Sequence, residues 1–275
     1  MADKSGRTAG KPAVKEVQKP FISGSIIDEN TLKNSLFFTG TMIVVIFIAF
    51  LACAAATFSN LLLRLAMNLA VIAVALMIFF NSGSRHGAEA VARGEILYQK
   101  KERGQSFSGE ERKICFHQAK GFLTGFIGTI PFLILALLLA VNTGIQMTEA
   151  GTLPSWMQAY TRRSDIGNAL ISYTQPEGMN FIDYCRMLIR ICIIPFVNIV
   201  GHTDKAGLCV LEKLSPLILL LPAAAYGTGY LTGRNIRTRI HTAISENNKR
   251  RIQKDKKRRA ARNNNRGRHE TEQLN

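Results

Sequence analysis

The chain has 275 residues, of which 47% are hydrophobic and 20% charged, and 35 Lys and Arg against 19 Asp and Glu give a formal charge of +16. This hydrophobic content excludes a chain that is disordered throughout, because such chains are poor in apolar residues along their whole length. The apolar residues gather in a few long uncharged runs, and much of the basic excess lies near the C-terminus. This distribution argues against a single soluble domain and predicts an all-α, multi-pass membrane protein.

Four apolar runs are long enough to cross a bilayer as helices. They cover residues 36–58, 61–82, 121–145 and 214–233. A hydrocarbon core about 30 Å thick needs roughly 20 helical residues, and the only charged residue within these runs is Arg64. We therefore expect four transmembrane helices.

A fifth apolar stretch, residues 187–200, is interrupted by Arg190 and Asn198 and is short for a span. Such lengths are typical of interfacial, re-entrant or buried segments. Helical spacing puts Arg186 and Arg190 on the side opposite Leu188, which suits a helix lying in the outer surface of the bilayer. We expect an external helix that is interfacial or re-entrant.

The first apolar run has a competing interpretation as a cleaved signal peptide, because Ala52, Cys53 and Ala54 resemble a cleavage site. The polar leader before it, residues 1–34, is too long for the basic leader of a signal peptide, so we expect a retained span. The sequence contains no Asn-x-Ser/Thr acceptor, which agrees with a bacterial cell membrane.

The distribution of Lys and Arg predicts the orientation. Residues 1–34 carry six, residues 83–120 carry eight and residues 234–275 carry fourteen, whereas residues 146–213 carry six. Cytoplasmic segments are enriched in Lys and Arg. Four spans put the three most basic regions on one side, so we expect both termini in the cytoplasm; a fifth span would put the basic tail outside.

The polar segments suggest how the chain is organised. We expect a largely disordered cytoplasmic arm (1–34), a transmembrane domain (35–233) with a cytoplasmic helical hairpin (85–120) and an external segment (146–213), and a basic cytoplasmic tail (234–275). Ser108 with Glu111 predicts a helix start, and that helix can continue into the third span. Ser215 and Pro216 predict the start of the fourth, which we expect to end near Asn247 before a disordered tail.

Motifs that would indicate catalysis are missing. The sequence has no GxxxxGK[S/T] loop, no HExxH and no GxSxG, which are signatures of nucleotide, zinc-protease and hydrolase sites. Its five Cys form no CxxC pair, and Cys115 with His117 falls short of the ligand number of zinc. We expect no metal and no cofactor, and a non-enzymatic protein, although catalytic groups can converge from separated segments.

The second span carries a polar face. Asn60, Arg64 and Asn68 are spaced by four residues and therefore lie on one side of the helix. Polar groups within a bilayer usually face the bundle interior or a water-filled cavity. Arg64 is also close enough to the helix end for its side chain to reach the outer interface. Both interpretations remain open: an interfacial Arg64, or a polar pocket or substrate path lined by Arg64 and Asn68.

Two helix faces are rich in glycine. Gly121 and Gly125 have the GxxxG spacing, and Gly229 and Gly233 repeat it in the fourth span. Such faces let helices approach closely. They predict packing within the four-helix bundle or, alternatively, a homo-oligomer contact.

The tail is the strongest functional signal in the sequence. Its fourteen Lys and Arg stand against four acids. Basic clusters next to a span attract anionic lipid headgroups, the same composition suits RNA phosphates, and the cluster can also serve only as a topology signal. The residues expected to bind an anionic partner are Lys249, Arg250, Arg251, Lys254, Lys256, Lys257, Arg258, Arg259, Arg262, Arg266 and Arg268.

These features favour a membrane adaptor or accessory component whose basic tail binds anionic lipid, RNA or the ribosome. The alternative is a small transporter, channel subunit or insertase-like protein that uses Arg64 and Asn68. A basic tail together with a cytoplasmic hairpin resembles membrane insertases in outline.

Overall fold

The computed structural model describes residues 17–55, 60–143, 155–167, 169–170, 180–201 and 204–272. Over these residues the fold is all-helical and contains no strand. Four helices are long and apolar enough to cross a membrane: α1 (Glu29–Ala55), α2 (Leu61–Glu102), α4 (Lys120–Asn142) and α9 (Lys205–Glu272). The prediction of an all-α chain with four such helices is confirmed.

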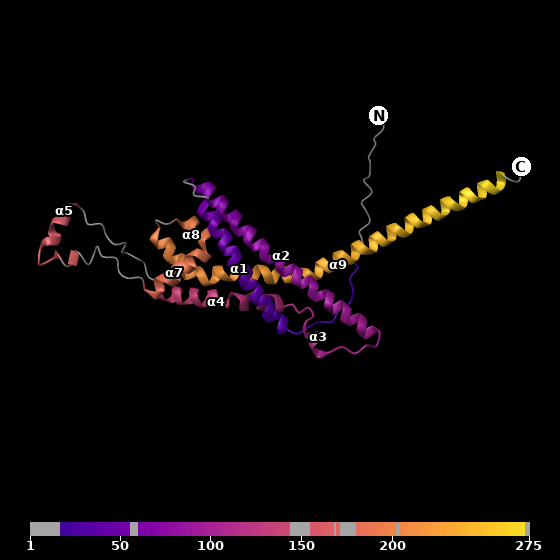
Figure 1. Cartoon of the computed structure of the whole chain (residues 1–275), viewed down its shortest axis with the longest axis horizontal. Helices are drawn as coiled ribbons and strands as arrows, with labels where there is room; N and C mark the ends of the chain where they lie inside the picture. Colours follow the sequence, from indigo (N-terminus) through magenta and orange to yellow (C-terminus); the bar gives the residue numbers. More distant parts are fainter. Residues whose placement is uncertain are drawn as a thin grey trace, which may run out of the picture.

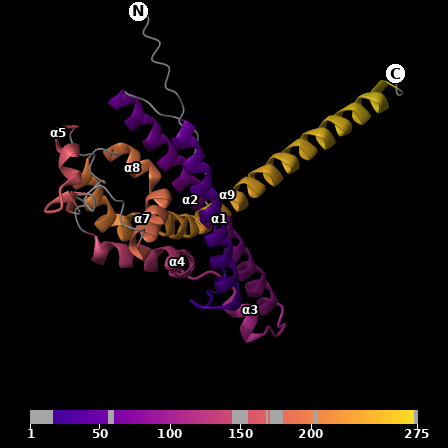
Figure 2. The ribbon, with the colours of Figure 1, turned by 60° about the vertical axis from the view of Figure 1, so that its left-hand side comes forward.

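Short helices lie at the two ends of the bundle. Helix α3 (Gly109–Lys113) lies at one end, and at the other lie α5 (Ser155–Gln158), the 3-10 helix η1 (Ala159–Arg162), α7 (Phe181–Cys192) and α8 (Ile194–Val200). Helices α1 and α2 form an antiparallel pair that crosses α9 at an angle, whereas α4 runs alongside α9 (Figures 1 and 2). The second half of α9 leaves the bundle and projects away from it (Figure 1).

Helices α2 and α9 touch through their backbones where they cross. A Cβ placed on Gly83 would lie 2.1 Å from the carbonyl oxygen of Tyr226. One placed on Gly87 would lie 2.2 Å from the carbonyl oxygen of Tyr230, and Gly229 is equally tight from the opposite side. Only glycine permits this approach, which is how small residues let membrane helices pack closely.

Both glycine faces predicted from the sequence are used inside one chain. Gly121 packs against the ring of Tyr230 and Gly125 against the backbone of Ala223, while Gly229 and Gly233 face α2. These contacts agree with the prediction that the glycine faces pack within the bundle. A homo-oligomer would need another surface.

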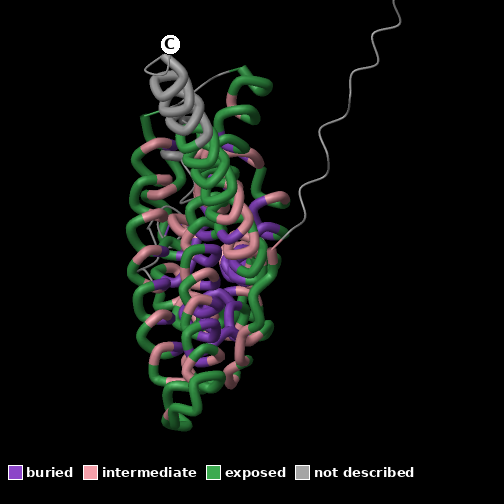
Figure 3. The backbone as a smooth tube through the Cα atoms, turned by 90° about the vertical axis from the view of Figure 1, so that its right-hand side faces the viewer, coloured by how far each residue is buried: buried purple, intermediate pink, exposed green. Residues whose placement is uncertain are grey.

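The outer faces of α1 and α2 expose many large apolar side chains. Ile43, Phe47, Leu69, Val74 and Met77 are examples, and buried residues gather where the helices pack together in the centre of the bundle (Figure 3). In water, an apolar surface of this size would promote association, whereas lipid tails can cover it. These exposed faces fit a protein embedded in a bilayer.

The hairpin expected over residues 85–120 differs from expectation in its second arm. Ser108 does begin α3, since its Oγ accepts a hydrogen bond from the Glu110 amide at 3.3 Å. The helix ends at Lys113 and does not run into α4, because residues 114–119 turn inward and bury Phe116 against the bundle. The hairpin is therefore α2 packed against a short helix and a turn.

The N-terminal arm also differs from expectation. Residues 1–16 lie outside the described part of the chain, but residues 17–28 form an extended strap across the base of the bundle. The amide of Gly24 donates to the carbonyl of Phe116 at 2.9 Å, and Asp28 forms a buried ion pair with Lys120 at 2.7 Å. Backbone hydrogen bonds and one buried ion pair order this strap. Neither can be predicted from the composition of the arm.

Helix α9 begins ten residues earlier than Ser215. Its first turn is held by Asp204, whose Oδ1 accepts a hydrogen bond from the Gly207 amide at 2.9 Å, so Ser215 and Pro216 lie inside the helix. Proline cannot donate to the carbonyl four residues earlier. Ser215 Oγ donates to that carbonyl, of Glu212, at 2.7 Å, which explains how the helix tolerates the proline.

The far end of α9 also departs from the expected tail. The helix continues past Asn247 to Glu272 without a break. From Asn247 to Arg259 every residue is exposed, and the side chains beyond Arg259 lie outside the described part of the structure. At about 1.5 Å per residue, α9 is roughly 100 Å long.

The stretch 187–200 is not a single span. Helix α7 ends at Cys192 and α8 begins at Ile194, so the chain turns at Ile193 ahead of Pro195. Both short helices pack against the long helices at the end of the bundle (Figure 1). The segment is a broken helix wedged between α1, α2, α4 and α9.

Candidate functional site

The first candidate site is the basic end of α9. Lys249, Arg250, Arg251, Lys254, Lys256, Lys257, Arg258 and Arg259 are all exposed. Arg262, Arg266 and Arg268 continue the helix, but their side chains lie outside the described part of the structure. Figures 1 and 2 show this end of α9 standing clear of the bundle. Its basic side chains can therefore approach a partner from any direction around the helix.

A buried carboxylate fixes α9 just before it leaves the bundle. Glu95 on α2 accepts hydrogen bonds from Arg237 Nη2 at 2.5 Å and makes a 2.8 Å contact with His241 Nε2. Burial alone would raise the pKa of Glu95, but the hydrogen bonds from Arg237 and His241 outweigh burial and lower that pKa. An ionised Glu95 thus holds two basic residues of α9 and fixes the direction of the tail.

The strap reinforces this attachment. The amide of Val17 donates to Thr242 Oγ1 at 3.1 Å, and the guanidinium of Arg234 lies 5.6 Å from the ring centre of Phe21. Cation–π contacts of this length are weakly stabilising. The base of the tail is therefore held by α2 on one side and by the strap on another.

The structure brings Arg64 and Asn68 together but gives them different surroundings. Asn68 is buried; its amide nitrogen donates to the carbonyl of Arg64 at 2.8 Å and its oxygen accepts from the Cys53 thiol at 3.4 Å. Arg64 reaches the end of α8, where a Cβ on Gly201 would lie 3.8 Å from Nη2. The negative end of a helix dipole suits a cation there.

Within the described part of the chain, the side chain of Arg64 contains one unsatisfied hydrogen-bond donor. Its Nε is buried and has no hydrogen-bond partner among the described residues. Buried donors are usually paired, so an exception calls for an explanation. The side chain as a whole is half-buried, which leaves the guanidinium within reach of a ligand from the bilayer side.

Sequence reasoning missed Glu212, which organises the end of the bundle that carries α7 and α8. Its side chain is 3% exposed, and its Oε1 accepts from Arg190 Nε at 2.8 Å. Its Oε2 accepts from Arg186 Nε at 3.2 Å and from Thr143 Oγ1 at 3.1 Å, and Arg186 also pairs with Asp183 at 2.6 Å. These contacts join α7, α9 and the end of α4.

This cluster reverses the expected orientation of α7. In an interfacial helix the arginine side would face solvent, yet Arg186 turns inward to Glu212 while Tyr184, Met187 and Leu188 are exposed. A carboxylate on another helix attracted the arginines inward. The available signal was Glu212 itself, an acid two residues before an otherwise uncharged span.

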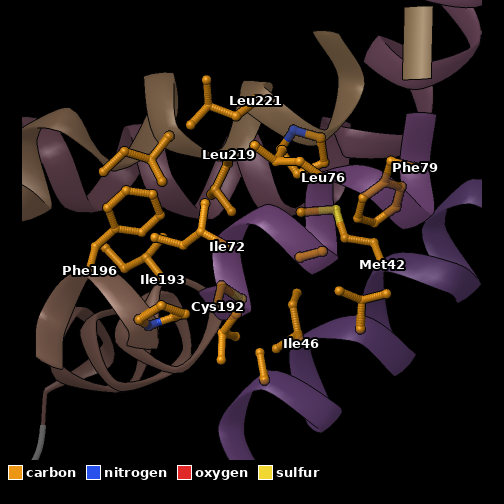
Figure 4. A pocket seen from close by; sticks show the side chains of 17 residues that line it. Met42, Ile46, Ile72, Leu76, Phe79, Cys192, Ile193, Phe196, Leu219 and Leu221 are labelled. Atoms are coloured by element: carbon orange, nitrogen blue, oxygen red, sulfur yellow. The ribbon is translucent and has the colours of Figure 1, made fainter. Parts of the chain in front are cut away.

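An apolar cavity of about 80 Å³ lies between α1, α2, the α7–α8 turn and α9. In Figure 4, Met42 and Ile46 of α1, Ile72 of α2, Phe196 of α8 and Leu219 of α9 converge on it. A second cavity of about 230 Å³ lies between α1 and α2 and is also lined by apolar residues. Neither cavity is suited to conducting an ion, because it offers no polar path.

Chemistry that needs clustered ligands has little support in the described residues. Among them, no group of three or more His, Cys, Asp or Glu side chains could hold a metal ion. All five cysteines are free, and only Cys192 is not buried. Comparison with protein-family models, with curated proteins and with solved structures gave no match for this chain.

Proposed function

We propose that the protein is a non-enzymatic membrane adaptor that presents a rigid basic helix to RNA phosphates in the cytoplasm, such as those exposed on ribosomes. The observation that carries this proposal is the continuity of α9. One unbroken helix runs from Lys205 to Glu272, and it is exposed on every side from Asn247 to Arg259. A helix that is polar all round usually bridges to something beyond its own domain.

The length of α9 favours RNA over the lipid of the same membrane. Lys249 lies 16 residues beyond Gly233, the end of the fourth apolar run, or roughly 24 Å along the helix. Arg268 is roughly 50 Å away by the same rise. Attraction between exposed charges is largely screened beyond about 10 Å at 0.1 M salt. A straight α9 thus holds the basic end away from its own headgroups.

The arrangement of the basic segments supports an orientation with both termini in the cytoplasm. The strap, α3 and the projecting end of α9 gather at one end of the bundle, while α5, α7 and α8 gather at the other (Figure 1). The three most basic regions of the sequence therefore share one side, in agreement with the positive-inside rule.

The alternative, a small transporter, channel subunit or insertase-like protein, draws less support from the geometry. Asn68 is bound to α1 and to its own helix, and Arg64 lies against the end of α8. The cavities beside them are apolar. A path for a polar substrate would need walls of polar, hydrated side chains.

The test uses the full-length protein in nanodiscs of neutral lipid, with ribosomal RNA as the probe. Changing Lys256, Lys257 and Arg258 to Gln should weaken binding at least tenfold. It should also flatten the dependence of log K on log salt by roughly 2 to 3, because each lost phosphate contact removes about 0.7–0.9 from the slope.

The matched control changes three exposed basic residues at the same end of the bundle, Arg85, Lys101 and Arg103, to Gln. This control should bind RNA as the wild type does. Equal RNA affinity in the tail variant and the wild type would refute the proposal. If the tail binds vesicles of anionic lipid and does not bind RNA, the partner of the tail is lipid and the RNA proposal is wrong.

A further inference from the structure

Helices α1 and α2 leave an open seam although they follow one another in the chain. The two cavities described above meet at this seam and share Val45 and Ala49 of α1 with Val71 and Ala75 of α2. The small side chains of Ala49 and Ala75 leave space between the two helices. The result is an apolar groove between α1 and α2 that borders the inner cavity at these four residues.

The size of the groove limits what can fill it. One turn of an α-helix, about 10 Å wide and 5.4 Å long, occupies roughly 400 Å³, more than the 230 Å³ available between α1 and α2. A methylene group is about as large as a water molecule, roughly 30 Å³. The outer cavity alone therefore has room for roughly half of a typical acyl chain.

Arg64 lies one helical turn before Met67, the first residue of α2 that lines the groove. Arg64, Val71 and Ala75 are separated by seven and eleven residues on α2, so they lie along one face of the helix. The same guanidinium carries the buried Nε that has no partner among the described residues. A guanidinium matches a phosphate group in charge and hydrogen-bond geometry.

We propose that the groove between α1 and α2 binds a phospholipid, with one acyl chain along Val71 and Ala75 and the phosphate at Arg64. The lipid belongs to the leaflet that contains the end of α1 and the start of α2. Its phosphate accepts a hydrogen bond from Arg64 and its chain fills the apolar cavities. Arg64 is then a ligand-binding residue.

This site is independent of the basic tail. The groove lies near the start of α2, at the opposite end of the bundle from the exposed end of α9 (Figure 1). Loss of lipid binding should leave RNA binding unchanged, and loss of RNA binding should leave lipid binding unchanged.

The test is photo-crosslinking of the full-length protein in phosphatidylcholine nanodiscs that contain a phosphatidylglycerol with a diazirine on one acyl chain. Labelled peptides should map to the facing walls around Ala49 and Ala75. Ala75→Leu should reduce this labelling at least fivefold by filling the groove. Ala73→Leu adds the same atoms on an exposed face of the same helix and should leave labelling unchanged.

The phosphate contact is tested separately. Arg64→Gln should reduce labelling severalfold, and Arg64→Lys, which keeps the charge, should recover part of it. If Ala75→Leu does not yield a monodisperse protein, Ala49→Leu on the opposite wall replaces it. Equal labelling of the groove-filling and control variants would overturn the site, and unchanged labelling of Arg64→Gln would overturn the role of the phosphate.

Discussion

The two ends of the bundle attach their helices to α9 by different means. At the end that carries α7 and α8, α7 makes few contacts with α9, and Glu212 joins them through two arginines, one of them buried and the other about a third exposed. At the end near α3, α2 packs against α9 through glycines whose backbones touch, and the ion pair of Glu95 adds to this packing. The α7 end therefore depends on charge, and the α3 end depends first on shape.

The largest effect should come from removing Glu212. Glu212→Ala leaves the buried Arg186 with Asp183 alone and removes the carboxylate from Arg190, about a third of whose side chain is exposed. The cost should therefore be about 3 kcal/mol, the lower end of what breaking a buried pair costs. Thermal unfolding of the purified protein in detergent should show this loss. Glu246→Ala, which removes a carboxylate in a loose surface pair with Arg250 at 4.0 Å, should have almost no effect.

The comparison is sharpened by a compensating variant. Combining Glu212→Leu with Arg186→Met and Arg190→Met removes all three charges at once and should recover much of the stability, as buried ion clusters replaced by apolar residues often do. An equally large loss in the triple variant would mean that shape, and not charge, holds the α7 end.

An intermediate effect is expected where α2 and α9 touch. Gly87→Ala would put a Cβ 2.2 Å from the Tyr230 carbonyl oxygen, so the helices must separate, at a cost of about 1–3 kcal/mol for overpacking. Gly40→Ala is the matched control, because no atom lies within 4 Å of the added Cβ. There the better helix propensity of alanine should stabilise α1 by up to about 1 kcal/mol. Melting temperatures that shift equally would contradict the assigned contact.

The smallest effect should come from Glu95, and it should depend on pH. Arg237 is a quarter exposed, so water can partly replace Glu95, and Glu95→Gln should cost about 1 kcal/mol. Because the folded-state pKa of Glu95 is lowered from 4.5, its ionised form adds stability that is fully present above pH 4.5. That stability is lost as the pH falls through the lowered pKa.

The measurement compares the melting temperatures of the wild type and Glu95→Gln between pH 7 and pH 3. The difference should be constant down to about pH 4.5 and should then shrink. Glu89→Gln, an exposed change on the same helix, should track the wild type throughout. A difference that grows in acid would contradict the direction of the pKa shift.

The sequence predicts the long helices well, because bilayer thickness acts on each run separately. The four apolar runs correspond to α1, α2, α4 and α9, and the helix start predicted from Ser108 and Glu111 is confirmed at α3. These signals are local: a length, a composition or two residues three apart.

What sequence reasoning missed depends on partners distant in the chain. The inward turn of Arg186 needs Glu212, 26 residues away, and the order of the strap needs Lys120, 92 residues from Asp28. The start of α9 at Lys205 was not predicted, because Ser215 followed by Pro216 is itself typical of a helix start. Among the site residues, Arg64 could be identified from its charge within an apolar span. The groove beside it could not be predicted, because alanines leave a cavity only where the two helices that carry them are far enough apart.

The unbroken α9 has a mechanical consequence. Among the described residues, the helix is last held at Thr242, by the strap, and at about 1.5 Å per residue its arm extends roughly 45 Å beyond this point to Glu272. A stiff rod that is fixed near one end acts as a lever. A partner that pulls the tip sideways therefore loads the contacts at its base first, those of Glu95 with Arg237 and His241 and that of the strap with Thr242.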